Sequence, residues 1–207
     1  MRLSEKAYYL IKEKIVTLEL APSSVIDART LLEETGLGRT PIREALQRLA
    51  AEGLVNIVPR RGMFVADISI TDLQKISEVR IVLESFCVRL AAQRVTESQI
   101  AEMEAILQDL EQVPNGDARA LMVIDERAHT LLYQAADNEF LAGILGRLYA
   151  PSLRLWYLTL DRLGDVREAI EQHREIAEAL KARDGARAEA LIQQHIAEFQ
   201  QRIRAVL

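Results

Sequence analysis

The sequence predicts a mainly α-helical protein in which a winged helix-turn-helix precedes an antiparallel bundle of six helices. Three observations lead to this fold class. Residues 1–66 contain three helical segments and then two short strand-like segments, whereas from residue 71 onward the apolar residues follow only the helical period. Residues 67–70 form a brief linker between these parts. With 207 residues, 49% of them hydrophobic, the chain can bury two modest cores, in domains 1–66 and 71–207.

Three helices are expected in the first domain. Residues 6–19 place apolar side chains at helical spacing. A short helix at about 28–35 stops before Gly36, a residue favoured just after a helix end. The third helix opens at Thr40-Pro41, because proline fits the first turn, where its missing N–H costs nothing.

Two strand-like runs, 54–58 and 63–66, flank a turn that contains Arg60 and Arg61, a pattern typical of a hairpin with a basic tip. Three helices and such a hairpin describe a winged helix-turn-helix, whose third helix enters the major groove of DNA. Residues 1–66 hold ten Lys/Arg against eight Asp/Glu, while the rest of the chain holds sixteen against twenty-three. The overall charge of −5 therefore does not exclude nucleic acid as a partner of the first domain.

The leading edge of the third helix carries Arg39, Thr40 and Arg43. An arginine can bridge guanine O6 and N7, and Thr40 can meet a phosphate or a base edge. The alternative is a solvated helix face. The adjoining hairpin favours DNA contact.

Six further helices are expected in the second domain, at about 71–93, 97–112, 118–136, 138–162, 165–183 and 186–206. Helices of this length joined by short loops imply an antiparallel bundle.

Two of the three histidines are expected to lie level in a helical hairpin that turns at Asp184-Gly185. His173 lies eleven residues before Asp184, and His195 lies ten residues after Gly185. At about 1.5 Å per residue, both are roughly 15–17 Å from the turn. Both also occupy the apolar stripe of their helix, so they should face one bundle interior.

Asp125 and His129 share a helix face because of their i,i+4 spacing. Asp125, His129, His173 and His195 thus project from three helices into one interior. Three histidines and a carboxylate are partners for a divalent metal, and this set favours Zn²⁺, with Ni²⁺ or Mn²⁺ as alternatives. The competing interpretation is three core histidines, each hydrogen-bonded to an internal partner.

Arg80 falls on the apolar stripe of its helix, so its guanidinium is expected to face the core, where it needs a carboxylate. One interpretation is an internal partner such as Glu84 or Asp125. The functional interpretation is that Arg80 and the metal together hold a small organic acid. Tyr133 is a further candidate for the wall of that pocket.

The sequence from Gly36 to Leu46, with Leu49, Glu52 to Val55 and Arg61-Gly62, resembles the GntR family of bacterial transcription regulators. The remainder is similar to the FCD ligand-binding domain of the FadR subgroup, in its shorter, VanR-like version of six helices. The residues that carry this second resemblance are Glu78, Val79, Arg80, Glu84, Asp125, His129, Asn138, His173, Ile176 and His195.

The resemblance implies a set of DNA contacts on both the helices and the wing. These residues are Arg29, Arg39, Thr40, Arg43, Arg61 and Gly62. Two features depart from the family pattern. Gly38 stands where the family usually has serine, so one hydroxyl for the DNA backbone is missing, and Ala21-Pro22 replaces the common Pro-Gly ahead of the second helix.

The chain has one cysteine, Cys87, which rules out an internal disulfide and fits a reducing cytosol. Lys12 and Lys14 interrupt the apolar residues near the N-terminus, and no stretch approaches the roughly 20 apolar residues of a membrane span. A cytoplasmic protein with no membrane partner is expected.

These features predict a homodimeric transcription regulator, a repressor, whose binding to a pseudo-palindromic operator is controlled by a small carboxylate at a metal site. Two alternatives stay open. A metal with open positions can activate water in a hydrolytic enzyme, but no general base stands near the ligands, so no enzyme is expected. A metal-free regulator that senses acyl-CoA is the other, and the three histidines argue against it.

Overall fold

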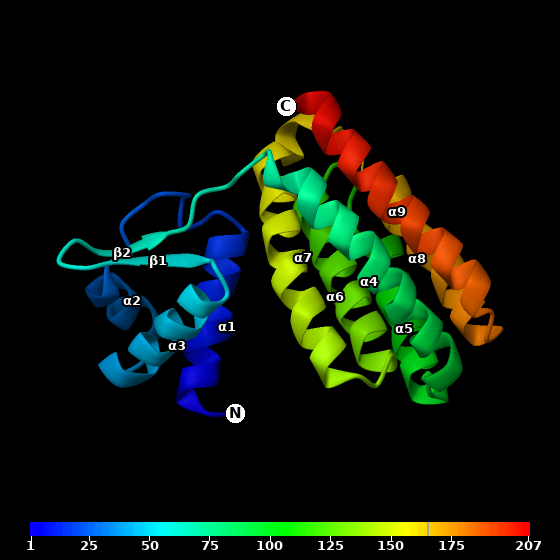
Figure 1. Cartoon of the computed structure of the whole chain (residues 1–207), viewed down its shortest axis with the longest axis horizontal. Coiled ribbons are helices and arrows are strands. Elements are labelled where there is room, and N and C mark those ends of the chain that lie inside the picture. The colour runs from blue at the N-terminus through cyan, green and yellow to red at the C-terminus, as the bar shows by residue number, and fades with distance from the viewer. Residues whose placement is uncertain (165) are drawn as a thin grey trace. The chain divides into compact units, whose positions relative to one another are not determined.

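The computed structural model describes residues 1–164 and 166–207, and these form two compact units, Met1–Ser69 and Ile70–Leu207 (Figure 1). The expected succession of three helices, a hairpin and long helices is confirmed in the described residues. None of the described helices combines the length and apolar character needed to cross a membrane.

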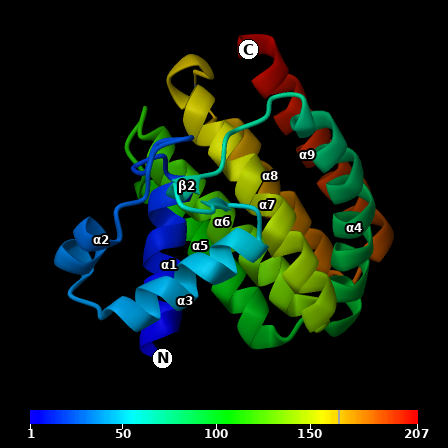
Figure 2. The same ribbon diagram turned by 60° about the vertical axis from the view of Figure 1, so that its left-hand side comes forward.

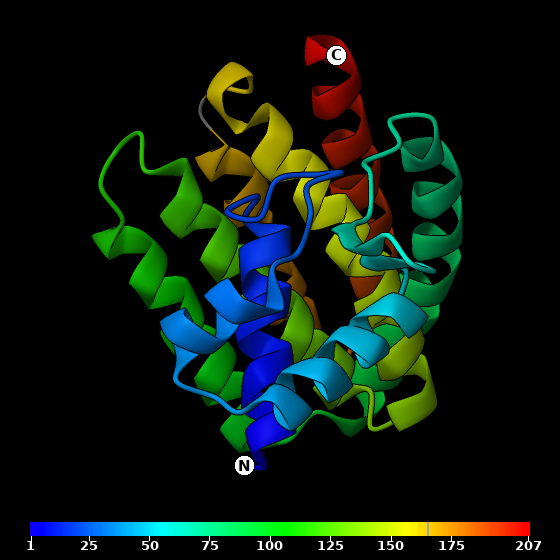
Figure 3. The same cartoon turned by 90° about the vertical axis from the view of Figure 1, so that its left-hand side faces the viewer.

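The first helix, α1 (Leu3–Val16), begins and ends about three residues earlier than the sequence pattern indicates. At its start the Arg2 N–H donates to Glu5 Oε2 at 3.0 Å, which satisfies a donor that the first turn leaves free. At its end Leu18 adopts a φ of +63°, a left-handed conformation that terminates helices. The buried face of α1 packs against α3 (Arg39–Ala51), and Figure 3 shows these two helices crossing.

The short helix α2 (Ala28–Thr35) has a cap at each end. The Asp27 side chain accepts the Arg29 N–H at 2.8 Å, and Gly36 follows the helix with a φ of +66°. The next helix, α3, begins one residue before the expected Thr40, and its N-cap residue, Gly38, has no side chain to accept a hydrogen bond.

The wing is an antiparallel pair, β1 (Val55–Val58) and β2 (Gly62–Val65). The segment before α2 adds to it, because Val25 forms a bridge with Phe64. Sequence periodicity did not indicate this extra pairing, since one bridging residue leaves no alternating pattern.

The second unit contains six long helices and one 3₁₀ turn among its described residues. They are α4 (Asp72–Arg94), α5 (Glu97–Gln112), α6 (Ala118–Ala135), α7 (Glu139–Thr159), η1 (Leu160–Arg162), α8 (Arg167–Lys181) and α9 (Gly185–Val206). Helix α4 packs along α9 and also contacts α6, α7 and α8 (Figures 1 and 2).

Two boundaries differ from the expectation. The segment expected as one helix over 138–162 is α7 followed by η1, so its last three residues tighten into a 3₁₀ turn. The expected first residue of the next helix, 165, lies outside the described residues, and α8 begins at Arg167.

The interior of the second unit is mainly apolar, and among its described residues it contains a group of neighbouring charged side chains and histidines. Its members, all less than 9% exposed, are Arg80, Glu84, Asp125, His129, His173 and His195. Burying a charge without a partner costs several kcal/mol, so these side chains must satisfy one another or a bound ligand.

Candidate functional site

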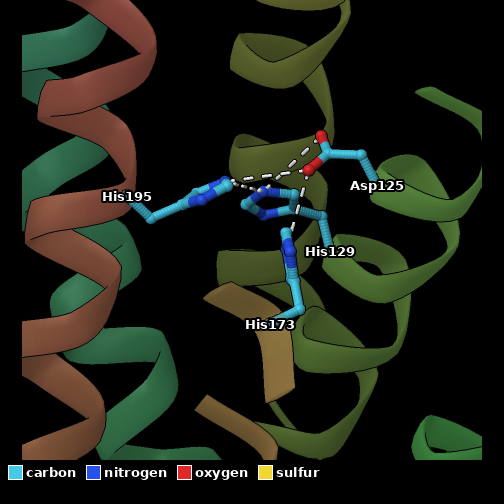
Figure 4. A group of neighbouring side chains, drawn as sticks. All are labelled: Asp125, His129, His173 and His195. Carbon is cyan, nitrogen blue, oxygen red and sulfur yellow. Dashed lines mark hydrogen bonds and ion pairs between the residues drawn. The ribbon is translucent and has the colours of Figure 1, made fainter. Parts of the chain in front are cut away.

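Four candidate metal ligands come together from three helices. Figure 4 shows Asp125 and His129 extending from α6, His173 from α8 and His195 from α9 toward a common point. One ligand atom from each lies within 4.8 Å of the other three. The sequence-based expectation that these four side chains meet is therefore confirmed in the geometry.

The converging atoms are the three Nε2 atoms and the Asp125 carboxylate. His173 Nε2 and His195 Nε2 each lie 3.7 Å from Asp125 Oδ1. His129 Nε2 lies 3.9 Å from Asp125 Oδ2 and 3.3 Å from His195 Nε2. The His173 and His195 rings, expected to be level in their hairpin, have centroids 4.6 Å apart.

Each histidine has an acceptor at its other ring nitrogen. His173 Nδ1 lies 3.1 Å from the Ile170 carbonyl oxygen, and His195 Nδ1 lies 3.0 Å from Gln172 Oε1. His129 Nδ1 lies 3.1 Å from Glu84 Oε2. An acceptor at Nδ1 assigns the proton there and leaves a lone pair on Nε2, which is the tautomer that binds a metal through Nε2.

Two of the converging atoms have no hydrogen-bond partner although they are fully buried: Asp125 Oδ1 and His173 Nε2. An unsatisfied buried polar atom costs about 1–3 kcal/mol, and native proteins rarely carry one without a reason. A divalent cation would satisfy both, so the donor set fits a metal.

The charge states also suit a cation. Burial lowers the pKa of His173 to about 4, against the opposing effect of Asp125. Burial likewise lowers the pKa of His195 well below its ordinary value, and neighbouring His173 adds to that shift. Burial alone would raise the pKa of Asp125, but the imidazoles and the Tyr149 hydroxyl outweigh it, so the pKa is lowered. Neutral imidazoles at His173 and His195 beside an ionised Asp125 are the protonation states that bind a metal.

Arg80 lies beside this cluster and has an internal carboxylate partner. Its Nε donates to Glu84 Oε1 at 2.6 Å, so of the two internal partners that the sequence offered, the structure has Glu84 rather than Asp125. Burial would raise the pKa of Glu84, but the guanidinium outweighs burial and holds it below its ordinary value. Glu84 therefore joins Arg80 to His129 through its two oxygens.

Two tyrosines border the cluster. The Tyr133 hydroxyl, expected near the pocket, lies 3.4 Å from His129 Nδ1. The Tyr149 hydroxyl donates to Asp125 Oδ2 at 2.6 Å, a contact that the sequence interpretation missed. Tyr149 falls between Leu145 and Leu153 on the buried stripe of α7, which marks it as a core residue but not as a partner of Asp125.

The predicted DNA-contacting side chains are all exposed. Three of them, Arg29, Arg39 and Arg43, line a groove of about 350 Å³ between α2, α3 and β2, whose floor is largely apolar. Arg61 and Gly62 lie at the hairpin turn. Gly62 has a φ of +111°, which a residue with a side chain rarely adopts, so the wing turn depends on glycine there.

Comparison with protein families and known proteins gives a match for each of the two units. A family model for "Bacterial regulatory proteins, gntR family" matches residues 3–65, and the FCD domain model matches residues 75–198. The HTH-type transcriptional repressor RspR of Escherichia coli is 29% identical over 204 residues, which cover 98% of this chain and 90% of RspR. The Nta operon transcriptional regulator of Aminobacter aminovorans is 31% identical over 183 residues, 87% of this chain and 85% of that protein.

Solved structures show the same fold. The structure of McbR/YncC from E. coli superposes with a TM-score of 0.86 at 23% identity and covers 100% of this chain and 97% of McbR. A GntR regulator from a Rhodococcus species gives a TM-score of 0.76 at 17% identity, with 99% and 98% coverage. Since the FCD model alone spans more than half of the residues and the gntR model spans most of the rest, the chain belongs to the GntR family of bacterial transcription regulators and carries an FCD domain.

Proposed function

We propose that this regulator is a cytoplasmic repressor whose operator binding is controlled by a small carboxylate that binds beside a metal ion in the FCD domain. The observation that carries the proposal is the convergence of three Nε2 atoms on the Asp125 carboxylate, with two of the ligand atoms otherwise unsatisfied. RspR is named as a repressor, which supports repression rather than activation.

The proposed ligands are Asp125, His129, His173 and His195, and Zn²⁺ is the favoured ion because imidazole nitrogen with one carboxylate suits it well. Ni²⁺ and Mn²⁺ are alternatives. A cation held there would supply a fixed positive charge with which the carboxylate of a small acid can pair.

Arg80 and Tyr133 are the proposed effector contacts. Both side chains are buried, and both are connected to the Nδ1 end of His129: the Tyr133 hydroxyl lies 3.4 Å from it, and Arg80 pairs with Glu84, which lies 3.1 Å from it. Glu84 occupies only the Nε side of the Arg80 guanidinium among its described hydrogen bonds. The remaining guanidinium N–H groups have the planar geometry that recognises a second carboxylate.

A homodimer is proposed because apolar side chains are exposed on two packed helices of the FCD domain. Val79, Val82 and Phe86 on α4 are 46–66% exposed, and Phe140 on α7 is 78% exposed. An exposed apolar patch of this kind favours association. A two-fold dimer would present two wing domains to a pseudo-palindromic operator.

The proposed operator contacts are those of the groove and the wing. Arg39, Thr40 and Arg43 would read base edges from the start of α3, while Arg29, Arg61 and Gly62 would follow the backbone and the adjacent groove. The predicted linker, residues 67–70, would transmit a change in the FCD domain to this surface.

The relatives are transcription regulators rather than enzymes, so the hydrolytic alternative is not supported. The acyl-CoA alternative has less support than the metal site, because the side chains around the three histidines include charged and polar groups, which do not suit an acyl chain.

The test is a titration of Zn²⁺-loaded protein with operator DNA, first selected from a random duplex pool, in the presence of small mono- and dicarboxylates or an acyl-CoA. At least one acid should weaken operator binding fivefold or more, the size of an ordinary allosteric coupling. The double variant His129→Ala/His173→Ala should bind operator without responding and should lose the metal. Equal metal content in both proteins would contradict the metal site, and a response to acyl-CoA alone would contradict the carboxylate.

A further inference from the structure

A hydrogen-bonded chain runs from the surface of the FCD domain to His195. Gln172 on α8 accepts at Oε1 from His195 Nδ1, 3.0 Å away, and its Nε2 donates to Glu198 Oε2 on α9. The other Glu198 oxygen accepts from Gln194 Nε2 at 2.8 Å. Gln172 and Glu198 are both partly exposed, so this series of hydrogen bonds links the buried cluster to the surface.

The three histidines of the cluster differ in what holds their Nδ1 atoms. His173 faces a backbone carbonyl, which cannot donate a hydrogen bond, and His129 faces the Glu84 carboxylate at 3.1 Å, with the Tyr133 hydroxyl farther away at 3.4 Å. His195 faces a side-chain amide, which presents an acceptor at one end and a donor at the other. For His195, therefore, the tautomer depends on which way the amide of its partner is turned.

Glu198 determines that direction. An ionised carboxylate only accepts hydrogen bonds, so the amide must turn its NH₂ group toward Glu198 and its oxygen toward His195. The imidazole must then carry its proton on Nδ1 and leave the Nε2 lone pair directed at Asp125 and His129. With the amide reversed, its NH₂ group would face Nδ1, the proton would move to Nε2, and that nitrogen would be closed to a metal.

We propose that Gln172 and Glu198 are positioning residues for the metal site: Glu198 fixes the Gln172 amide, and the amide fixes His195 in the tautomer that binds metal. This inference rests on the proposed metal site. It also makes the affinity for the metal depend on Glu198, a partly exposed residue that is not itself a proposed ligand.

The direct test is the tautomer of His195 in metal-free protein, read by ¹⁵N NMR of labelled histidine. The wild type should have the proton on Nδ1. Glu198→Lys places a donor opposite Gln172, which should reverse the amide and shift the proton to Nε2. Glu175→Lys, an equal charge change at an exposed position on α8, is the matched control and should leave the tautomer as in the wild type.

Zn²⁺ affinity, measured by competition with a chromogenic chelator, is the second readout. Glu198→Lys should weaken Zn²⁺ binding about 10–100-fold, the usual effect of losing such a supporting group, whereas Glu175→Lys should not. The double variant Gln172→Glu/Glu198→Lys should restore both readouts, because a carboxylate at position 172 accepts from Nδ1 and pairs with the new ammonium group. This rescue also tests the proposal if Glu198→Lys alone folds poorly.

The proposal is overturned if His195 keeps its Nδ1 proton in Glu198→Lys, or if the double variant behaves like the single one. Its failure can be distinguished from failure of the proposed function. A wild type that binds no Zn²⁺ removes the metal site, whereas the NMR tautomers of the metal-free proteins still decide whether Glu198 and Gln172 set the state of His195.

Discussion

The Nε2 atoms of His129 and His195 lie 3.3 Å apart, although 66 positions separate these residues in the chain. Their Nδ1 atoms lie 3.1 Å from Glu84 Oε2 and 3.0 Å from Gln172 Oε1, and both of these oxygens can accept a hydrogen bond. Both Nε2 atoms then present lone pairs to each other, an arrangement that repels unless a positive charge lies near both. The interior thus favours a bound cation, and the consequences can be measured.

Removal of the metal is expected to destabilise the protein. A cation that binds only the folded state stabilises it by about 2.7 kcal/mol when present at 100 times its Kd. For domains of this size that corresponds to a rise in Tm of roughly 10 °C, to be measured by thermal unfolding of chelator-treated and Zn²⁺-reloaded protein. If Zn²⁺ raises the Tm of the His129→Ala/His173→Ala variant by the same amount, the ion stabilises the protein from another site.

Acid should destabilise the metal-free protein through His173. Its pKa of about 4 lies below the 6.5 of an unfolded histidine, so the unfolded state gains a proton first as the pH falls. The stability that this group contributes is complete above pH 6.5 and is lost between pH 6.5 and about 4, up to about 3 kcal/mol. Urea unfolding at pH 7.5, 6 and 5 measures it. A His173→Gln variant with an equally steep loss would contradict the assignment.

Replacing Arg43 should weaken operator recognition. Arg43→Ala removes an exposed guanidinium from the α3 groove, and a bidentate contact to guanine is worth about 1–3 kcal/mol of base discrimination. Fluorescence anisotropy should show specific affinity falling about 5–150-fold with little change in nonspecific binding. The control Lys181→Ala removes an exposed positive charge from the FCD domain. Equal losses in both variants would assign Arg43 a general electrostatic role.

Serine at position 38 should strengthen both the helix and the DNA complex. Gly38 is the N-cap of α3 with an extended backbone (φ −73°, ψ 166°), and a Cβ there would lie no closer than 3.7 Å to Pro41. Gly38→Ser should raise the free energy of unfolding by a few tenths of a kcal/mol and add one hydroxyl for a phosphate. Chemical unfolding and operator titration check these effects. Looser binding would mean that glycine is required for close approach to DNA.

Loss of Arg80 should expose its structural role beside its proposed effector role. Arg80→Met leaves the Glu84 charge buried without its guanidinium, which should cost about 3–5 kcal/mol of stability. Arg80→Met/Glu84→Gln should recover much of this loss because the buried charge is gone. Urea unfolding measures both. If Arg80→Met is as stable as the wild type, the buried Glu84 charge is not stabilised by Arg80.

Much of the site could be predicted from the chain because it depends on helical spacing. The i,i+4 relation puts Asp125 and His129 on one face of α6, and the turn at residues 184–185 sets His173 level with His195. Tyr149 and Gln172 were not predicted. A tyrosine on an apolar stripe and a glutamine beside a histidine are common in helices that hold no ligand, so neither has a distinctive sequence signal.

Four features could be predicted from the amino-acid sequence: the order of the elements, the helical faces that become buried, the GntR and FCD resemblance, and the four side chains that meet. The resemblance rests on particular residues, such as those from Gly36 to Leu46, whereas the other three follow from local periodicity and turn chemistry, which act over a few residues. The packed structure was needed to show that Arg80 pairs with Glu84, and that Glu84, Gln172 and the Ile170 carbonyl lie at the three Nδ1 atoms. Those choices depend on the rotation of packed helices and on side-chain rotamers, because hydrogen bonds form only over about 3 Å.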